Sequence, residues 1–235
     1  MKRTYTKIHI QKKIYFICIV AFMASLFACK SSNTEVAVGS LSVYNVSPTP
    51  ATYDIYVSGT KMNSVAIPFG GGVKYIQYTP GTYDVKFTYS GYTDNLYTKT
   101  GIGVSNGSYN SLYLIGKPGN FDALYLTDNF SGTAADKAYV RFINLSPDAP
   151  ALDLAVESGS TLSSNKAYKA YSGFIAVDPG SKAFEIKETA SGTVKATIAA
   201  TTLAAANFYT IISRGLYQPS SPSEHPFSGQ IIIQQ

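Results

Sequence analysis

From about residue 41 to the end of the chain, apolar and polar residues alternate with a period of two rather than 3.6. Segment 83–89 shows this clearly, because its four apolar residues all fall on one face of an extended strand. Gly and Pro-Gly pairs separate the alternating runs, as turns require. The pattern predicts strands at 43–46, 53–57, 73–78, 83–89, 111–115 and 123–126, and again at 139–145, 152–156, 174–177, 184–187, 194–199, 208–212 and 230–233.

The chain repeats itself at an offset of 99 residues. Segment 41–55, LSVYNVSPTPATYDI, returns at 140–154 as VRFINLSPDAPALDL. The recurring residues are Asn45, Ser47, Pro48 and Asp54, which return as Asn144, Ser146, Pro147 and Asp153. Segments 75–76 and 80–81 recur at the same offset. A repeat of this length indicates duplication of a whole domain, and we interpret the recurring residues as a structural turn motif between two strands.

These patterns predict an all-β fold with two tandem immunoglobulin-like (or related) antiparallel β-sandwich domains, at 40–131 and 136–235. The only competing helical segment, 201–206, is too short to count. The short linker leads us to expect that the two sandwiches touch end to end. Loop 116–121 becomes a longer Pro- and Ser-rich loop at 215–227, which is either a binding loop or tolerated surface length.

Residues 1–28 have the three parts of an export signal: basic residues, an apolar run at 14–27, and a small residue before Cys29. The sequence LFAC at 26–29 resembles the bacterial lipoprotein box, in which the cysteine is lipidated. The alternatives are an uncleaved anchor helix and an ordinary signal peptide. Residues 29–39 form a polar tether. We therefore expect an outer-membrane lipoprotein of the bacterial cell envelope, held by lipid on Cys29, with its periplasmic or surface face left open.

The charge and the cysteine content of the chain narrow the class of protein further. Five of the 19 Lys and Arg residues precede Cys29, so the rest of the chain carries 14 basic and 14 acidic residues. A nucleic-acid partner is not expected, because phosphate binding needs a basic excess. The only cysteines are Cys18 and Cys29, so the folded part is held by its core without disulfides.

Segment 141–154, RFINLSPDAPALDL, and the VDPG turn at 177–180 resemble a bacterial family called domain of unknown function 4397. Its members typically open with H/N-x-S-P-D-A-P-x-V-D-V and later show a P-A/x-G turn. The resemblance covers the second module well and the first less well, because TPA at 49–51 replaces Asp-Ala-Pro. It implies an immunoglobulin-like or related sandwich in secreted or lipid-anchored proteins, often in tandem. The motif carries no assigned chemistry.

Candidate catalytic groups are few. His225 is the only histidine after Cys29, and a Ser-His-Asp set would have to use it. It lies in the Pro-rich loop, where nothing in the sequence orients it, so we expect a surface histidine. A zinc site needs three or four ligands, and Cys29 is committed to lipid. We therefore expect no metal, no cofactor and no catalytic residue.

The repeated acids leave two interpretations open. Asp54 and Asp153 could act as paired carboxylates in glycoside hydrolysis. Alternatively, each accepts hydrogen bonds from backbone N–H groups of the Ser-Pro corner, as short acids do at turns, and a duplicated acid favours this shared structural role. Calcium could bind near Asp128 or Asp148, although no D-x-[DN]-x-[DN]-G loop exists.

Tyrosine is unusually common. Of the 17 tyrosines after Cys29, 12 lie between Tyr44 and Tyr125. Exposed tyrosines would form platforms for sugars or proteins, whereas buried ones would fill cores that lack tryptophan. The binding candidates are Tyr92, Tyr97 and Tyr217.

Together these features predict a non-catalytic, lipid-anchored cell-envelope protein with two β-sandwich modules, acting in adhesion, recognition or structural spacing. Its partners would be the membrane, through the lipid, and a surface protein or glycan. The alternative function is a carbohydrate-binding accessory lipoprotein that uses exposed tyrosines of the first module. A carboxylate enzyme is the third hypothesis.

Overall fold

The computed structural model describes residues 36–130 and 134–234. In this part the chain is all-β, with sixteen strands and no helix. From Ala37 onward it forms one compact unit. The expected signal peptide 1–28, Cys29 and most of the tether lie outside the described residues.

The strands confirm the all-β prediction and repeat in order. The first eight are β1 (Gly39–Asn45), β2 (Tyr53–Val57), β3 (Thr60–Lys61), β4 (Gly72–Tyr78), β5 (Gly81–Tyr89), β6 (Tyr97–Val104), β7 (Tyr109–Ile115) and β8 (Asp122–Asp128). The next eight are β9 (Ala138–Asn144), β10 (Leu152–Val156), β11 (Thr161–Lys166), β12 (Ile175–Val177), β13 (Gly180–Glu188), β14 (Val194–Leu203), β15 (Phe208–Arg214) and β16 (Ser228–Ile233). Segment 201–206 ends β14 and enters a turn, so it is not helical.

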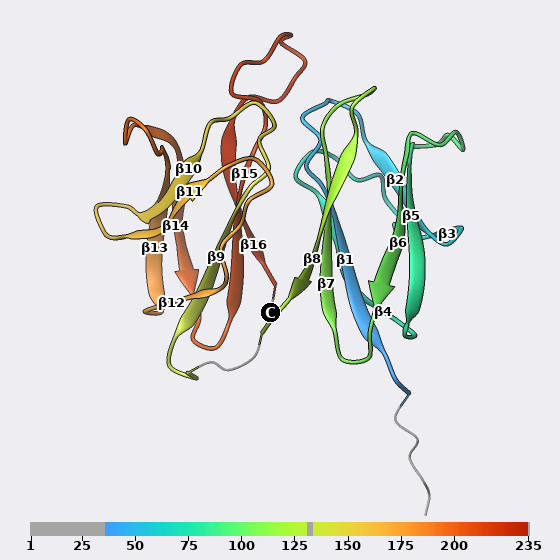
Figure 1. The fold of residues 1–235 in the computed structure, drawn as a ribbon, viewed down its shortest axis with the longest axis horizontal. Coiled ribbons are helices and arrows are strands. Elements are labelled where there is room, and N and C mark those ends of the chain that lie inside the picture. Colours follow the sequence, from blue (N-terminus) through green and yellow to red (C-terminus); the bar gives the residue numbers. More distant parts are fainter. Residues whose placement is uncertain (1–35, 131–133, 235) are drawn as a thin grey trace, which may run out of the picture. The chain divides into compact units, whose positions relative to one another are not determined.

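The strands form two β-sandwich-like units of two four-stranded sheets each (Figure 1). Module 1 (β1–β8) contains the sheets β4-β1-β7-β8 and β3-β2-β5-β6, and module 2 (β9–β16) contains β12-β9-β15-β16 and β11-β10-β13-β14. The sheets are not purely antiparallel as predicted, because β1 pairs with β7, and β9 with β15, in parallel. After β1 the chain turns at Pro48 and continues as β2 in the opposite sheet. Strand β1 therefore lies beside β7, which comes near the end of the module.

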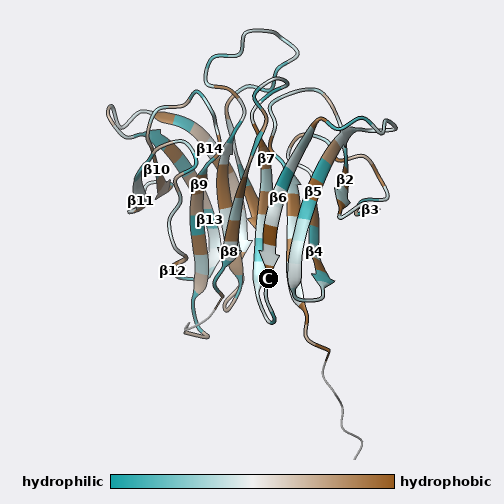
Figure 2. Cartoon of the chain, turned by 45° about the vertical axis from the view of Figure 1, so that its right-hand side comes forward, coloured by the Kyte–Doolittle hydropathy of each residue, from teal (hydrophilic) through white to brown (hydrophobic). Residues whose placement is uncertain are grey.

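Each module has its own core between its two sheets. Tyr53, Phe87 and Leu112 are fully buried in module 1, and Phe142, Phe184 and Ile211 are fully buried in module 2. Apolar and polar residues alternate along many of the strands, as Figure 2 shows. Strands β1 and β9 depart from this pattern, because all seven residues of each are buried.

A third apolar cluster explains this double burial. It joins Tyr44, Val46, Tyr113, Ile115 and Leu126 of module 1 with Ile143, Leu145, Ile212 and Ile232 of module 2. The sheets that contain β1 and β9 therefore pack on one another face to face. The expectation of an end-to-end contact is wrong, because it assumed that the second face of β1 and β9 meets water.

Candidate binding site at the junction of the two modules

The repeated corner motif is a hydrogen-bonded turn in both modules. Asn45 Oδ1 accepts a hydrogen bond from the Ser47 backbone N–H (3.0 Å), and Ser47 Oγ donates to the Gly116 carbonyl (2.7 Å). The same contacts recur between Asn144 and Ser146 (3.2 Å) and between Ser146 and Gly215 (2.8 Å). A short amide side chain that bonds its own backbone two residues on fixes a turn. The motif thus ties each corner to the loop that follows the parallel strand.

The repeated acids lie in separate modules, Asp54 on β2 and Asp153 on β10. Asp54 is buried, forms an ion pair with Lys61 Nζ (2.9 Å) and accepts from the Gly91 backbone N–H (3.1 Å). Burial alone would raise the pKa of Asp54, but Lys61, Gly91 and Asn63 lower it overall. Such a carboxylate is held in its charged form by structural partners.

Asp153 accepts hydrogen bonds from the Asn165 backbone N–H (2.7 Å) and from Thr189 Oγ1 (2.5 Å). Both acids therefore accept backbone hydrogen bonds, but from donors outside the Ser-Pro corner. The expected location of these donors is wrong, because the pleat of β2 and β10 turns the acids toward neighbouring hairpins.

The three tyrosine candidates do not form one surface. Tyr92 is 66 % exposed and lies between β5 and β6. Tyr97, on β6, is half-buried and donates to Asp122 Oδ1 (3.3 Å). Tyr217 belongs to module 2, is half-buried and donates to Glu188 Oε2 (3.1 Å). Only Tyr92 offers a largely free ring.

No group of three or more His, Cys, Asp or Glu residues among the described parts of the chain is arranged to hold a metal ion. The acids near which calcium was considered are engaged by protein groups. Asp148 accepts from the backbone N–H groups of Tyr217 (2.7 Å) and Gln218 (2.8 Å), and Asp128 is paired with Arg141.

The pair between Arg141 and Asp128 is buried at the junction. Arg141 Nη1 lies 2.7 Å from Asp128 Oδ1, and the two side chains are 4 % and 0 % exposed. Arg141 also donates to Thr210 Oγ1 and stacks on the ring of Phe174, 4.6 Å from its centre. Tyr75 donates to the other carboxylate oxygen (2.7 Å). A buried charge pair is tolerable only when it is satisfied in this way.

The same network shifts the pKa values of Arg141 and Tyr75. Burial alone would lower the pKa of Arg141, but the neighbouring Tyr113 and Asp128 raise it overall. Burial, followed by the charge of Asp128, raises the pKa of Tyr75 well above its ordinary value. Arg141 therefore stays charged and Tyr75 stays protonated over the whole physiological range.

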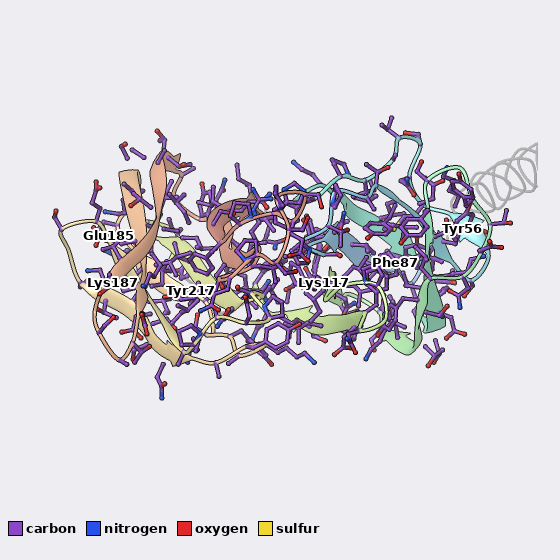
Figure 3. The ribbon with its side chains drawn as sticks, turned by 90° about the horizontal axis from the view of Figure 1, so that it is seen from above. Tyr56, Phe87, Lys117, Glu185, Lys187 and Tyr217 are labelled. Carbon is purple, nitrogen blue, oxygen red and sulfur yellow. The ribbon has the colours of Figure 1, made fainter. Side chains whose placement is uncertain are left out.

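The long loop of module 2 reaches onto module 1. The His225 backbone N–H donates to the Pro48 carbonyl (3.1 Å), and the His225 ring stacks on Phe69 with centroids 4.1 Å apart. Glu224 pairs with Lys117 at 2.7 Å. Lys117 lies near the middle of the view in Figure 3, where loops of both modules meet. The expectation of an unoriented surface histidine is wrong, because His225 is half-buried and fixed by Phe69.

An open groove of about 470 Å³ lies at the same junction, and Lys117 is among the residues that line it. Its walls include Pro147 and Tyr168 from module 2 and Asn120 from module 1. Lys169 and Asp122 also line the groove and form an ion pair with each other. Burial, followed by the charge of Asp122, raises the pKa of Tyr168 to about 12. The groove combines an aromatic ring, a proline and several polar groups, as small recognition sites do.

Sequence reasoning missed Tyr168, Phe69 and Arg141 as parts of this junction. Two signals could have found them. Phe69 and Tyr168 are aromatic residues separated by the repeat offset of 99. Arg141 is a lone charge within an apolar strand, which points to a buried partner.

The described residues, 36–130 and 134–234, include no helix of the length and apolarity needed to cross a membrane. No curated protein matches the chain. Residues 39–155 match the family described as Domain of unknown function (DUF4397), a match that spans module 1 and continues through β9 and nearly all of β10. The chain therefore contains one domain of the DUF4397 family, located at residues 39–155.

Proposed function

We propose that the chain is a non-catalytic protein of the bacterial cell envelope, anchored by lipid on Cys29, whose two modules together recognise a partner. The face-to-face packing of the modules through Tyr44, Tyr113, Ile143 and Ile212 carries this proposal. Domains joined through a large apolar face act as one body rather than as independent units.

This packing favours recognition over structural spacing. A spacer gains length by placing its domains end to end, whereas two domains side by side add little reach. Side-by-side packing instead brings loops 116–121 and 215–227 to one junction, where Lys117 and Glu224 meet. Loops held together by a firm scaffold are where binding sites usually form.

The engagement of the ionisable groups supports a non-catalytic role. General acid–base catalysis needs a group free to exchange a proton beside the substrate. Asp54 is instead paired with Lys61, Asp128 with Arg141, and His225 is stacked on Phe69. These groups serve the fold.

The repeat supports a second, finer proposal, that module 2 is another domain of the same family. The Asn45 and Asn144 side-chain amides donate to carbonyls 22 residues on, at Ile67 and Lys166.

In immunoglobulin constant-type domains the first two strands share a sheet. Here β1 and β2 lie in different sheets, so we assign the modules to a related sandwich class.

A carbohydrate-binding accessory role is the second candidate function, and the exposed ring of Tyr92 favours it. A polysaccharide that binds the chain, and binds Tyr92→Ala at least tenfold more weakly, would support this role. Equal binding by the two proteins would remove it.

Anchoring is tested by labelling growing cells with an alkyne-bearing fatty acid. The wild-type chain and Cys18→Ser, a matched control, should both incorporate label and sediment with membranes. Cys29→Ser should lose both properties.

Recognition is tested by photo-crosslinking the anchored protein on intact cells, where a specific adduct that depends on the junction loops is expected. Retained label in Cys29→Ser, or an absence of adducts, would count against the proposal.

A further inference from the structure

Phe69 and Tyr168 occupy equivalent places in the two modules. Each follows the same turn, in which the backbone N–H of the next residue donates to the corner asparagine carbonyl; these bonds join Gly70 to Asn45 and Lys169 to Asn144, both at 2.8 Å. Gly70 and Lys169 also share a positive φ, 78° and 67°. The environments of the two rings can therefore be compared directly.

In module 1 this place is filled by the chain itself. His225 lays its ring parallel to Phe69, at an interplanar angle of 8°, and its backbone N–H donates to the Pro48 carbonyl. The adjoining Glu224 carboxylate pairs with Lys117. One short segment, which turns at 221–224 before His225, thus contacts an aromatic ring, a carbonyl and a lysine at the same time.

In module 2 the corresponding Tyr168 is half-buried against the apolar cluster between the modules, and it also borders a groove. The loop that would cover it, 116–121, is seven residues shorter than loop 215–227. Tyr168 and Pro147 line the groove of about 470 Å³ together with Leu216, Gln218 and Ser220 at the start of loop 215–227. Among the described residues, no backbone N–H donates to the Pro147 carbonyl, whereas its counterpart Pro48 accepts from His225.

We propose that this groove binds a short peptide segment of a partner protein, which places a planar side chain on Tyr168 and donates a backbone N–H to the Pro147 carbonyl. The filled counterpart defines the chemistry of the ligand: a histidine or aromatic residue, preceded by a carboxylate and followed by proline. The proposal deepens, and rests on, the proposed role in recognition.

Lys169 stands where module 1 has Gly70, and Leu216 stands where module 1 has Lys117, so the ligand must accommodate both differences. The Lys169 ammonium lies 5.3 Å from the Tyr168 ring centre and also pairs with Asp122. Both side chains are about two-fifths exposed, at 42 % and 41 %, and such surface pairs are easily rearranged. Lys169 is therefore free to pair with the ligand carboxylate, as Lys117 does with Glu224.

The test uses residues 37–235, which contain all three apolar clusters and form one compact unit. The probe is a capped peptide with the sequence of residues 221–227, SPSEHPF. In an NMR titration the peptide should shift the amide signals of Tyr168, Lys169 and Asp122, with a Kd of about 1 mM, as expected for a short flexible segment. A peptide with alanine in place of the histidine should bind at least tenfold more weakly.

Tyr168→Ala should weaken binding at least tenfold, whereas Phe69→Leu, a change at the filled site, should leave binding unchanged. Three outcomes would overturn the proposal. The peptide could shift the same signals in Tyr168→Ala, or it could cause no shifts at about 10 mM. The oligosaccharide cellohexaose, added without peptide, could instead shift the signals of the groove. These outcomes do not bear on the labelling of Cys29 or on crosslinking at intact cells. A failure of the groove is therefore distinguishable from a failure of the proposed function.

Discussion

Arg141 Nη1 and Asp128 Oδ1 are 2.7 Å apart in a region from which water is almost excluded, and this contact joins the last strand of module 1 to the first strand of module 2. Arg141 is further held by Thr210 and by the face of Phe174. Removing one partner would leave an uncompensated charge inside the junction, which costs far more than the pair itself contributes.

Arg141→Met should therefore lower the free energy of unfolding by about 3–5 kcal/mol. The double variant Asp128→Leu with Arg141→Met should recover most of this loss, because no buried charge remains. Urea unfolding followed by circular dichroism measures both. Lys137→Met, which breaks the exposed pair with Asp178, serves as control and should leave stability unchanged. A small effect of Arg141→Met alone would show that water reaches the pair.

The apolar junction should make the two modules unfold together. Ile232 and Ile233 are neighbours on β16 that face opposite ways: Ile232 is 7 % exposed within the junction cluster, and Ile233 is 50 % exposed. Calorimetry of the wild type should give one transition. Ile232→Asp should separate or abolish it by burying a charge between the modules, whereas Ile233→Asp should keep one transition. Two transitions in the wild type would mean that the modules are energetically independent.

Much of this fold could be predicted from the sequence, because period-two alternation and turn residues act locally. The strand at 53–57 matches β2, and 152–156 matches β10. Alternation says which residues share a face but not what covers that face. Tyr44 and Ile143 were therefore assigned no partner, although they meet in the cluster between the modules. The face-to-face arrangement is a tertiary property that no local pattern specifies.

The site was less predictable for the same reason. The Asn and Ser residues of the corner were found, since their contacts are short-range turns. The ring pair of Phe69 and His225 joins residues 156 positions apart, and Tyr168 is recognised as the counterpart of Phe69 only by comparison with this pair. Tyrosine abundance drew attention to Tyr97 and Tyr217, whose hydroxyls are engaged by Asp122 and Glu188.

The corner asparagine should be a stability hot spot. The buried Asn144 amide donates to the Lys166 carbonyl (3.0 Å) and accepts from Ser146 N–H and Ser213 Oγ. Asn144→Ala leaves several buried groups without partners, so it should cost about 2–3 kcal/mol or more in chemical denaturation. The exposed Asn95→Ala is the control, for which at most about 0.5 kcal/mol is expected. Similar losses for the two variants would contradict a structural role of the motif.

Asp54 should affect acid stability rather than catalysis. Its pKa is lowered in the folded state, so its contribution is present above the unfolded value of about 3.9 and is lost as the pH falls below it. Asp54→Asn should lower the Tm at pH 7 and flatten the fall in Tm between about pH 4 and pH 2. Hydrolysis of a polysaccharide panel should be the same in both proteins. An activity that Asp54→Asn abolishes would revive the carboxylate-enzyme hypothesis.

The clamp formed by loop 215–227 should loosen in acid. Lys117, followed by the Ser220 backbone and hydroxyl groups, holds the pKa of Glu224 at about 2, below its unfolded value of about 4.3. A carboxyl with a depressed folded pKa stabilises the native state above the unfolded value, and this contribution is lost as the pH falls toward about 2.

Hydrogen exchange of the His225 amide, which is bonded to Pro48, should accelerate over that interval beyond its intrinsic change. Glu224→Gln and Lys117→Met should each make that exchange fast already at pH 6, with no further loss when combined. The exposed Glu157→Gln should leave the wild-type pH profile intact. If both clamp variants kept that profile, the stacking on Phe69 alone would hold the loop.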